Sequence, residues 1–375
     1  MGTSVRVPVE AATFANGCAV RYLDFNDTYL SKEAIHPSDN IPGIMAVGEA
    51  EGATGKDVIL GIVSAYDVAC KLADAFSIRN LGWDHVTYIS ISSALGAAKV
   101  MSLGVEQVEQ AVNLAVVPNV ALRQTRAGEL SMWKGCAAAN AARNGVFAAV
   151  LAKHGMTGPS PAFEGEMGFF KQLAESFDLD MLEGPHKVLH TLIKNHPAEY
   201  HAMSAVDAVL EARQRMNDVQ LDGLDVDTFM VAWQIIAKDP EKWNPQTRET
   251  ADHSLPFIVD RAFLDGGIWL DSYDPQKLTD ANVKRLLKLT KVRVDPEMNA
   301  MYPQAVPNRV TLRSGSKSET VEVDYPKGHF KNPMTDAEIE RKYLRLGAPG
   351  EALPALWRFD QCSLDDVVQA LEVEA

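Results

Sequence analysis

Small and apolar residues dominate the first half of the chain, and their spacing predicts packed helices. Segments of this character cover residues 41–76, with a break at residues 52–55 before a second helix over residues 56–76, and residues 90–101, 106–117 and 135–154. In the last segment, the small residues at 137–142 let two helix backbones approach closely. Gly155 follows, and glycine is typical of the position after a helix end. We therefore expect a helical domain built from packed hairpins.

The second half contains stretches in which polar and apolar residues alternate with a period of two, the pattern of half-buried strands. The predicted strands are residues 288–295, 308–313 and 318–325, with a hairpin turn at 313–317 and a further candidate strand at 226–237. Helical patterns return at residues 201–215, 279–289, 336–346 and 363–373. Thr335 and Glu338 have the spacing of a capping box, which favours a helix start there. The sequence thus predicts a mainly α protein with a smaller α+β domain.

Size and charge narrow the class of protein. A chain of 375 residues is long enough for a large core and two domains. Its formal net charge of −14 argues against nucleic acid and anionic membrane as partners. No apolar stretch reaches the ~18–20 residues of a membrane span, and the first residues lack a signal-peptide pattern. A site for an acidic ligand must then be a local cluster of cations within a negative envelope.

The four cysteines are widely separated, at Cys18, Cys70, Cys136 and Cys362. No pair has the Cys-x-x-Cys spacing of a zinc module, and the sequence offers no closely spaced ligands for an iron–sulfur cluster. Free cysteines are typical of a reducing compartment. We therefore expect a cytoplasmic protein that works without a metal or another cofactor.

The segment from Asp24 to Asp39 concentrates ionisable groups between two apolar stretches. It holds carboxylates, His36 and several hydroxyl and amide side chains, and these do not follow a helical stripe. Pro37 interrupts any helix, because its ring removes a donor and clashes with the preceding turn. A loop of this composition is a candidate site. A solvated turn with local side-chain caps would have the same composition.

A series of short motifs, in order along the chain, resembles one family. They are Asp24-Phe-Asn-Asp-Thr28 with His36-Pro37, Gly82-Trp-Asp-His85, residues 132–140, 155–159 and 163–169, Lys194-Asn-His-Pro-Ala-Glu-Tyr-His201, residues 248–256 and residues 325–333. Together they are similar to the MmgE/PrpD family, which includes 2-methylcitrate dehydratase and cis-aconitate decarboxylase. One motif alone would be weak, whereas the ordered series makes a functional role for the Asp24 segment the stronger interpretation.

The resemblance implies a large all-helical domain over residues 1–187, an α+β lid domain over residues 188–334, and C-terminal helices over residues 335–375 that return to the helical domain. It also implies a homodimer. Members of the family carry further helices before the Asp24 motif, whereas this sequence starts close to it. We therefore expect apolar surface on residues 41–76 or 90–117 to be uncovered and to attract a two-fold partner.

Dehydration of a citrate-type acid needs a base beside a carboxylate, an acid for the departing hydroxyl, and cations for the carboxylates. Histidine suits the first two tasks, and lysine or arginine the third. The predicted catalytic residues are Asp24, His36, His85, Lys134 and His201, and the predicted substrate-binding residues are Thr28, Lys194, Arg248 and His253. The resemblance implies that the matching Asp24, Thr28, His36, His85 and Lys134 lie in the family's active-site cleft. In this scheme His85 or His36 moves protons, Asp24 orients or shares a proton, and Lys134, Lys194 and His201 hold carboxylates.

Three of these residues also have a purely structural interpretation. His85 could be a satisfied core residue, Lys134 could extend from a helix start into solvent, and Lys194 could stabilise a helix C-terminus. Two further residues, Arg123 and Arg126, could bind a substrate carboxylate or pair with Glu129.

The sequence favours a hydro-lyase that acts on a small tricarboxylate, 2-methylcitrate or a close relative, and gives cis-2-methylaconitate without a metal or an iron–sulfur cluster. Residues 197–200, just before His201, resemble the dehydratase branch of the family. Two alternatives stay open. One is a lyase that decarboxylates cis-aconitate with similar anion contacts, and the other is a catalytically weakened relative.

Overall fold

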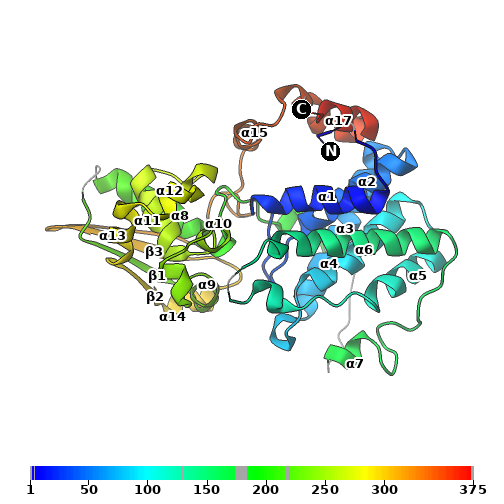
Figure 1. Cartoon of the computed structure of the whole chain (residues 1–375), viewed down its shortest axis with the longest axis horizontal. Helices are drawn as coiled ribbons and strands as arrows, with labels where there is room; N and C mark the ends of the chain where they lie inside the picture. The colour runs from blue at the N-terminus through cyan, green and yellow to red at the C-terminus, as the bar shows by residue number, and fades with distance from the viewer. Residues whose placement is uncertain (1, 4, 129, 174–183, 217–219, 373–375) are drawn as a thin grey trace.

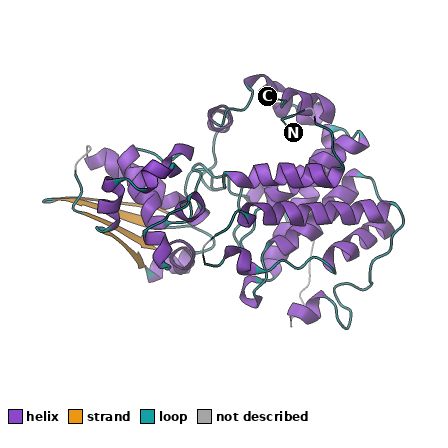
Figure 2. Ribbon diagram, in the orientation of Figure 1, coloured by secondary structure: helices purple, strands orange, loops and turns teal. Residues whose placement is uncertain are grey.

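The computed structural model describes residues 2–3, 5–128, 130–173, 184–216 and 220–372. A large helical domain lies beside a smaller α+β domain, and the C-terminal helices lie above them in the view of Figure 1. Figure 2 shows that the strands are confined to the smaller domain. The mainly α fold class with a smaller α+β domain, predicted from the sequence, is confirmed.

The helical domain is organised around one long central helix. Its helices are α1 (Val9–Tyr22), α2 (Ile41–Glu51), α3 (Gly55–Ala75), α4 (Val86–Val100), α5 (Val105–Val116), α6 (Trp133–Lys153) and the short α7 (Phe169–Leu173). Helix α6 packs against α1, α4 and α5. A Cβ atom on Gly145 of α6 would lie 2.3 Å from the carbonyl oxygen of Ser90 in α4. Small residues therefore set the spacing of these helices, as the alanine-rich pattern predicted.

The loop between α1 and α2 differs in one respect from the sequence prediction. Pro37 was expected to interrupt any helix, but it begins the 3-10 turn η1 (Pro37–Asn40), which runs directly into α2. Proline suits the first position of a helical turn, because its fixed φ is already helical and its missing N–H would have no partner there. The turn brings His36 and Asp39 back toward the end of α1.

The α+β domain contains a four-stranded sheet in the order β2-β1-β3-β4. Its strands are β1 (Gly223–Thr228), β2 (Thr290–Val294), β3 (Asn308–Ser314) and β4 (Lys317–Val323), and only β1 and β2 are parallel. Its helices are α8 (Met203–Met216), α9 (Met230–Ile236), α10 (Arg248–Ala251), α11 (Leu255–Asp265), α12 (Pro275–Leu278), α13 (Ala281–Leu287) and α14 (Pro296–Met301). Helix α8 packs on β3 and β4, and α11 packs on α8 and β2.

The predicted strand at residues 226–237 is wrong over most of its length. Strand β1 ends at Thr228, and residues 230–236 form helix α9. In this segment the buried residues Ala232 and Ile236 are four positions apart, which is a helical spacing. The start of β1 was missed because Leu224 and Asp225 are both buried, so the strand lacks a period-two alternation.

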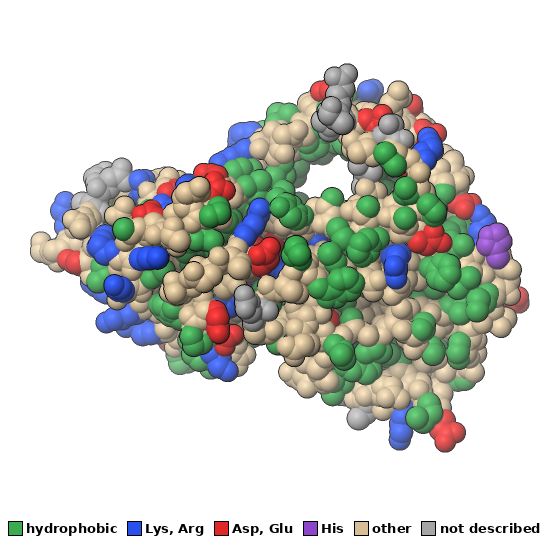
Figure 3. All heavy atoms as spheres, in the orientation of Figure 1, with side chains coloured by type: hydrophobic (Ala, Val, Ile, Leu, Met, Phe, Trp, Pro, Cys, Tyr) green, Lys and Arg blue, Asp and Glu red, His purple; other side chains and the backbone are tan. Residues whose placement is uncertain are grey.

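The C-terminal helices are α15 (Asp336–Arg345), α16 (Leu353–Trp357) and α17 (Leu364–Ala370). The capping box at Thr335 and Glu338 is confirmed. Helix α17 packs against α2, and Figure 3 shows an opening between the C-terminal segment and α1. Residue 373, the end of the helix predicted there, lies outside the described residues. Among the helices described, none is both long enough and apolar enough to cross a membrane.

Candidate active site

A cavity of about 300 Å³ lies where the helical domain meets the α+β domain. The helical domain contributes the loop before α2, the starts of α4 and α6, and the 3-10 turn η3 (Arg123–Arg126). The α+β domain contributes residues near the 3-10 turns η5 (Tyr200–Ala202) and η6 (Pro240–Trp243), helix α9, and the residues after α10. The walls carry four histidines and five cations: His36, His85, His201, His253, Arg79, Arg123, Arg126, Lys134 and Lys242.

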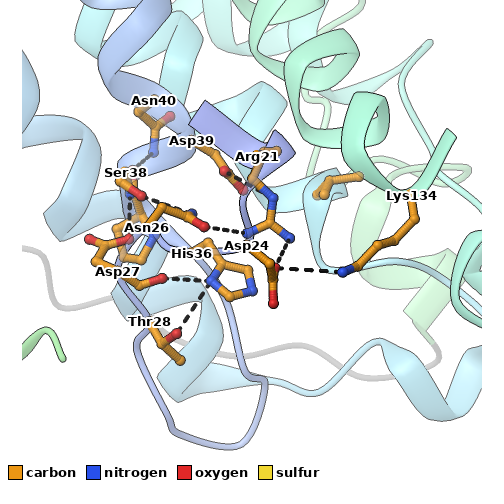
Figure 4. A network of polar contacts seen from close by, with 12 residues as sticks. Arg21, Asp24, Asn26, Asp27, Thr28, His36, Ser38, Asp39, Asn40 and Lys134 are labelled. Atoms are coloured by element: carbon orange, nitrogen blue, oxygen red, sulfur yellow. Dashed lines mark hydrogen bonds and ion pairs between the residues drawn. The ribbon is translucent and has the colours of Figure 1, made fainter. Parts of the chain in front are cut away.

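Asp24 is the hub of a buried network behind the cavity wall (Figure 4). The Nζ atom of Lys194 lies 3.0 Å from Oδ2 of Asp24 and donates to the Asp24 carbonyl at 2.7 Å. The Nζ atom of Lys134 lies 3.6 Å from Oδ1 of Asp24, and the guanidinium of Arg21 lies 3.7 Å from the same atom. Asp24 adopts a φ of +48°, and this left-handed backbone aims its carboxylate at all three cations.

The surrounding cations keep Asp24 ionised. Burial raises the pKa of this carboxyl, but Lys134 and Lys194, helped by His253 and Arg21, hold it well below its usual range. Burial in turn lowers the pKa of the Lys194 ammonium, which Asp24 opposes. The carboxylate is therefore a permanent counterion for the lysines around it.

His36 is held as a neutral imidazole. Its Nδ1 donates to the carbonyl oxygen of Asp27 at 2.6 Å, and the hydroxyl of Thr28 lies 3.4 Å from the same nitrogen. Since a carbonyl only accepts, Nδ1 carries the proton and Nε2 keeps a lone pair. Burial, together with Arg21 and Lys194, lowers the pKa of His36 well below its usual value. Its ring lies edge-on to His85, with centroids 5.6 Å apart.

His85 is oriented by a carboxylate that is itself shared. Its Nδ1 lies 3.0 Å from Oδ1 of Asp84, and Nε of Arg126 donates to both oxygens of Asp84 at 3.0 and 2.9 Å. Burial and the nearby Arg126 lower the pKa of His85, although Asp84 opposes this shift. Nε2 of His85 and one terminal nitrogen of Arg126 are buried and have no partner among the described residues. An unpartnered buried acceptor beside an unpartnered donor suits a substrate that brings both a proton and a carboxylate.

On the opposite wall, two more histidines are paired with carboxylates. Nδ1 of His201 lies 2.7 Å from Oε1 of Glu199, and Nδ1 of His253 bonds Oδ1 of Asp252. Burial raises the pKa of Glu199, but His201, together with His253 and Lys194, outweighs burial and lowers the pKa to about 2, so this carboxylate is ionised. Burial and Lys134 lower the pKa of His253. On its other side, Nε2 of His201 lies 3.4 Å from the hydroxyl of Tyr302.

Sequence reasoning missed these carboxylate partners, although the sequence held a signal for them. Each acid stands one or two positions before the histidine that it binds, as in Asp84-His85, Asp252-His253 and Glu199-Tyr200-His201. Because the acid and the histidine are so close in the chain, one local turn fixes their geometry. Arg21 was also missed, since it belongs to α1 and reaches the site only through the fold.

The predicted site residues fall into three groups. His36, His85, Lys134, His201 and His253 line the cavity together. Asp24, Thr28 and Lys194 lie behind the wall and contact wall residues or one another. Arg248 lies elsewhere, between the rings of Tyr22 and Tyr273, with its guanidinium carbon 5.5 and 5.9 Å from their centroids.

The two arginines whose role the sequence left open both reach the cavity. Arg126 is paired with Asp84, and Glu129 lies outside the described residues. Arg123 lines the cavity, and the structure records no hydrogen bond or ion pair for its guanidinium among the residues that it describes. Five cations on the walls face three acids, Glu33, Glu199 and Asp239, so the lining favours a polyanion in spite of the acidic chain.

One group of side chains has the spacing of metal ligands. Potential ligand atoms of Asp24, Asp252 and His253 lie within 4.8 Å of one another. Asp24, however, already neutralises Lys134 and Lys194, and two ammonium groups at this distance repel a divalent cation. The donor set is therefore a poor fit for a metal ion. The described cysteines form no cluster of three or more ligands either. Cys18 and Cys136 interact with each other, but Cys70 is in the core and Cys362 is at the C-terminal segment.

Comparison with known proteins gives a consistent result. The MmgE/PrpD N-terminal domain family matches residues 1–182, and the MmgE/PrpD C-terminal domain family matches residues 196–352. The 2-methylcitrate dehydratase of Escherichia coli O157:H7 is 30% identical over 356 residues, which cover 88% of this chain and 73% of that protein. The mitochondrial 2-methylcitrate dehydratase of Yarrowia lipolytica is 28% identical and covers 88% and 68%. The alkylcitrate dehydratase phiI of a fungal species is 29% identical and covers 92% and 74%.

Proposed function

Because the chain belongs to the MmgE/PrpD family, we propose that it is a carbon–oxygen lyase that removes water from 2-methylcitrate or a close tricarboxylate. The product of 2-methylcitrate would be cis-2-methylaconitate. The observation that carries this proposal is the inter-domain cavity, where a neutral His85 with a free Nε2 lies among cations that have room for carboxylates. The names of the relatives support the same reaction.

Binding of the substrate carboxylates falls to the cations of the helical wall. Lys134 is in the first turn of α6, and His85 directly precedes α4, so the positive ends of two helix dipoles also face this wall. Arg123 offers a guanidinium free for a bidentate contact, and Arg126 offers its unpartnered terminal nitrogen. Together these groups stabilise the extra negative charge that builds up on a carboxylate as its α-proton leaves.

The elimination itself needs one proton acceptor and one proton donor. Nε2 of His85 accepts the proton from the carbon beside a carboxylate, the C–H electrons form the new double bond, and the C–O bond breaks. The hydroxyl leaves as water after it takes a proton from Nε2 of His201. Glu199, being ionised, balances the charge of the imidazolium form of His201. Nε2 of His36, next to the ring of His85, is the second candidate for the proton acceptor.

We further propose that the reaction needs no metal ion and no iron–sulfur cluster. The supporting observation is the chemistry of the donor set, since the ligand-spaced group at Asp24 faces two lysines. Activity is then expected to survive dialysis against EDTA and to gain nothing from added iron. Loss of activity on chelation, with recovery on addition of one metal, would contradict this part of the proposal.

The reaction can be tested with three substrates in parallel. Purified protein is incubated with 2-methylcitrate, citrate and cis-aconitate, while absorbance of the conjugated product and release of CO₂ are followed. Dehydration predicts a rise in absorbance with 2-methylcitrate and no CO₂ from any acid. Release of CO₂ from cis-aconitate would favour the decarboxylase alternative, and inactivity with all three acids would favour the weakened relative.

We also propose that the protein acts as a cytoplasmic homodimer. The support for the reducing compartment is that the described cysteines are all free. The support for the dimer is a group of exposed apolar side chains on the helical domain: Val117, Val120, Leu122, Met132 and Trp133. They lie near the end of α5 and the start of α6. The sequence prediction was uncovered apolar surface on residues 41–76 or 90–117, and of these five side chains only Val117 falls within those ranges. Light scattering on the purified chain distinguishes a dimer from a monomer.

A further inference from the structure

A second and larger cavity, of about 800 Å³, lies beside helix α15. One wall is the face of α15 that carries Glu338, Arg341, Lys342 and Arg345. The other walls are the turn after α11, the 3-10 turn η7 (Leu270–Tyr273) with Trp269 before it, and the Asn195-His196 segment. None of these residues lines the inter-domain cavity described above. Figure 1 shows α15 above the junction of the two domains.

The acids of this second cavity are already neutralised. Asp265 and Asp271 both accept from Nζ of Lys277, at 2.8 and 2.9 Å, and Asp265 is also paired with Arg261. Glu338 is paired with Lys327 at 3.0 Å and caps its own helix. These three acids are therefore already balanced by neighbouring lysines and an arginine, and they do not neutralise the cations on α15.

The cations on α15 are not neutralised in this way. Within the part of the chain that the structure describes, no hydrogen bond or ion pair to a carboxylate is recorded for Arg341, Lys342 or Arg345. Arg345 lies over the ring of Trp269 at 3.8 Å, and Arg341 is exposed at the cavity rim. Arg341 and Arg345, at i and i+4, lie on one face of the helix, and Lys342 lines the same cavity, so three positive charges border one space.

Lys342 connects this space to the active-site network. Its Nζ donates to the carbonyl oxygens of Lys194 at 2.8 Å and Phe25 at 3.1 Å, and it lies 3.8 Å from the centre of the Phe25 ring. Phe25 follows Asp24 in the chain, and Nζ of Lys194 holds the Asp24 carboxylate. Burial and the nearby Lys194 lower the pKa of Lys342 to about 7, although Asp27 opposes this shift. Among the described residues, Lys342 bonds only to carbonyl oxygens and forms no recorded ion pair with a carboxylate.

We propose that the cavity beside α15 binds a small molecule with two neighbouring anionic groups, carboxylates or phosphates, between Arg341 and Arg345 and close to Lys342. The anion would supply the negative charge that these three cations lack, because the acids in the described walls are paired with other cations. By attracting the ammonium of Lys342, the anion also affects the hydrogen bonds that this lysine donates to the carbonyl oxygens of Phe25 and Lys194, next to the Asp24–Lys194 ion pair. The second cavity is thus an effector site that is joined to the first by one lysine.

Binding is measured by calorimetry on the full chain with two probes, inorganic pyrophosphate and malonate. Arg341→Gln/Arg345→Gln removes two of the three cations. Lys284→Gln/Lys288→Gln is the matched control, because it removes the same charge from two exposed positions, one on α13 and one directly after it, outside both cavities. Lys134→Met removes a cation from the inter-domain cavity and tests for binding there.

We expect at least one probe to bind the wild type, the control and Lys134→Met alike. Affinity should fall about tenfold or more in Arg341→Gln/Arg345→Gln, since charge-assisted contacts are lost. Pyrophosphate alone would indicate a phosphate ligand, malonate alone a dicarboxylate, and both the shared chemistry. Equal affinity in Arg341→Gln/Arg345→Gln, loss of binding in Lys134→Met, or no binding to the wild type would overturn the proposal.

The connection through Lys342 has its own readout. Binding of the probe should slow amide exchange in residues 23–28 and 192–196 of the wild type, because it steadies the carbonyls that Lys342 holds. Lys342→Met should abolish this slowing, whatever affinity it retains. Unchanged exchange in the wild type under saturating probe would show that the two cavities are independent.

Discussion

The two walls of the inter-domain cavity hold their histidines by different means. On the helical wall, Nδ1 of His85 contacts Asp84, whose charge is already shared with Arg126, and Nδ1 of His36 donates a hydrogen bond to a neutral carbonyl. On the α+β wall, His201 is hydrogen-bonded to Glu199, and no arginine or lysine forms an ion pair with this carboxylate among the described residues. A carboxylate that is shared with an arginine cannot fully balance an imidazolium, whereas an unshared one can.

This difference teaches how one fold can separate acid from base with the same side chain. On the helical wall, burial and nearby cations lower the pKa of both His36 and His85, which favours the neutral imidazole that the proposed proton acceptor needs. On the α+β wall, His201 has an ionised carboxylate partner, Glu199, which suits the proton-donor role proposed for it. The pKa of His253 on the same wall is lowered by burial and Lys134, as on the helical wall. The cavity places His85 and His201 on opposite walls, as the proposed acceptor and donor require.

The strongest test of the helical wall removes its central groups. His85→Gln and Lys134→Met should each lower kcat/KM by more than about 100-fold, because one removes the proton acceptor and the other a charge that stabilises the transition state. Steady-state kinetics with 2-methylcitrate measures the loss. Arg143→Gln, on the exposed surface of α6, is the control and should leave kinetics unchanged. Near-normal turnover in both cavity variants would place the chemistry elsewhere.

A second test exchanges the two partner carboxylates for amides. Glu199→Gln should lower turnover by roughly 100-fold, since the balancing charge for the acid is lost. Asp84→Asn should lower it by only about tenfold, because an amide oxygen still orients His85. Stability should rank in the opposite order. Asp84→Asn leaves buried Arg126 without a counterion, at a cost of ~3 kcal/mol in urea unfolding. The same rank in both assays would contradict the comparison.

The pH dependence of stability sharpens the picture further. A histidine with a lowered pKa in the folded state takes up its proton more readily when unfolded. The free energy of unfolding should therefore fall as the pH drops below about 7, through the ordinary histidine pKa near 6.5. The slope should be smaller in His36→Gln, by up to ~1.4 kcal/mol per pH unit. Urea unfolding between pH 7.5 and 5.5 measures it, and parallel curves for the two proteins would show that His36 does not contribute.

The smallest effect is expected at a residue that touches neither wall. Arg248 was predicted to bind substrate, yet it lies between Tyr22 and Tyr273. Arg248→Gln should change KM less than about threefold and should lower stability by ~1 kcal/mol, the scale of a partly buried cation–π contact. A large rise in KM with unchanged stability would restore Arg248 to the binding site.

The sequence predicted much of the fold, because period and composition determine single helices and strands. Small residues marked the helices around α6, and alternation marked β2, β3 and β4. The failure at residues 230–236 has the opposite origin. There a strand buried on both faces runs into a short helix, and neither element shows a clear period by itself.

The motifs predicted which residues gather at the site, but not how each is held. His36, His85, Lys134, His201 and His253 do meet in one cavity. Their protonation, however, depends on partners such as Arg126 and on burial, and both arise only from tertiary packing. For the same reason Arg248, which looked like a binding residue from its polar surroundings, could not be separated from the others.

The close contact between α4 and α6 means that the active site extends, in mechanical terms, well beyond the groups that touch the ligand. His85 precedes α4 and Lys134 lies in the first turn of α6, so the distance between these two side chains depends on how closely the two helices pack. Gly145 allows α4 and α6 to pack closely, because any side chain at this position would clash with the carbonyl oxygen of Ser90. An alanine at this position would push the two helices apart, change the distance between His85 and Lys134, and so lower the activity. Random mutagenesis for altered activity should therefore recover glycines and alanines of the bundle among its hits.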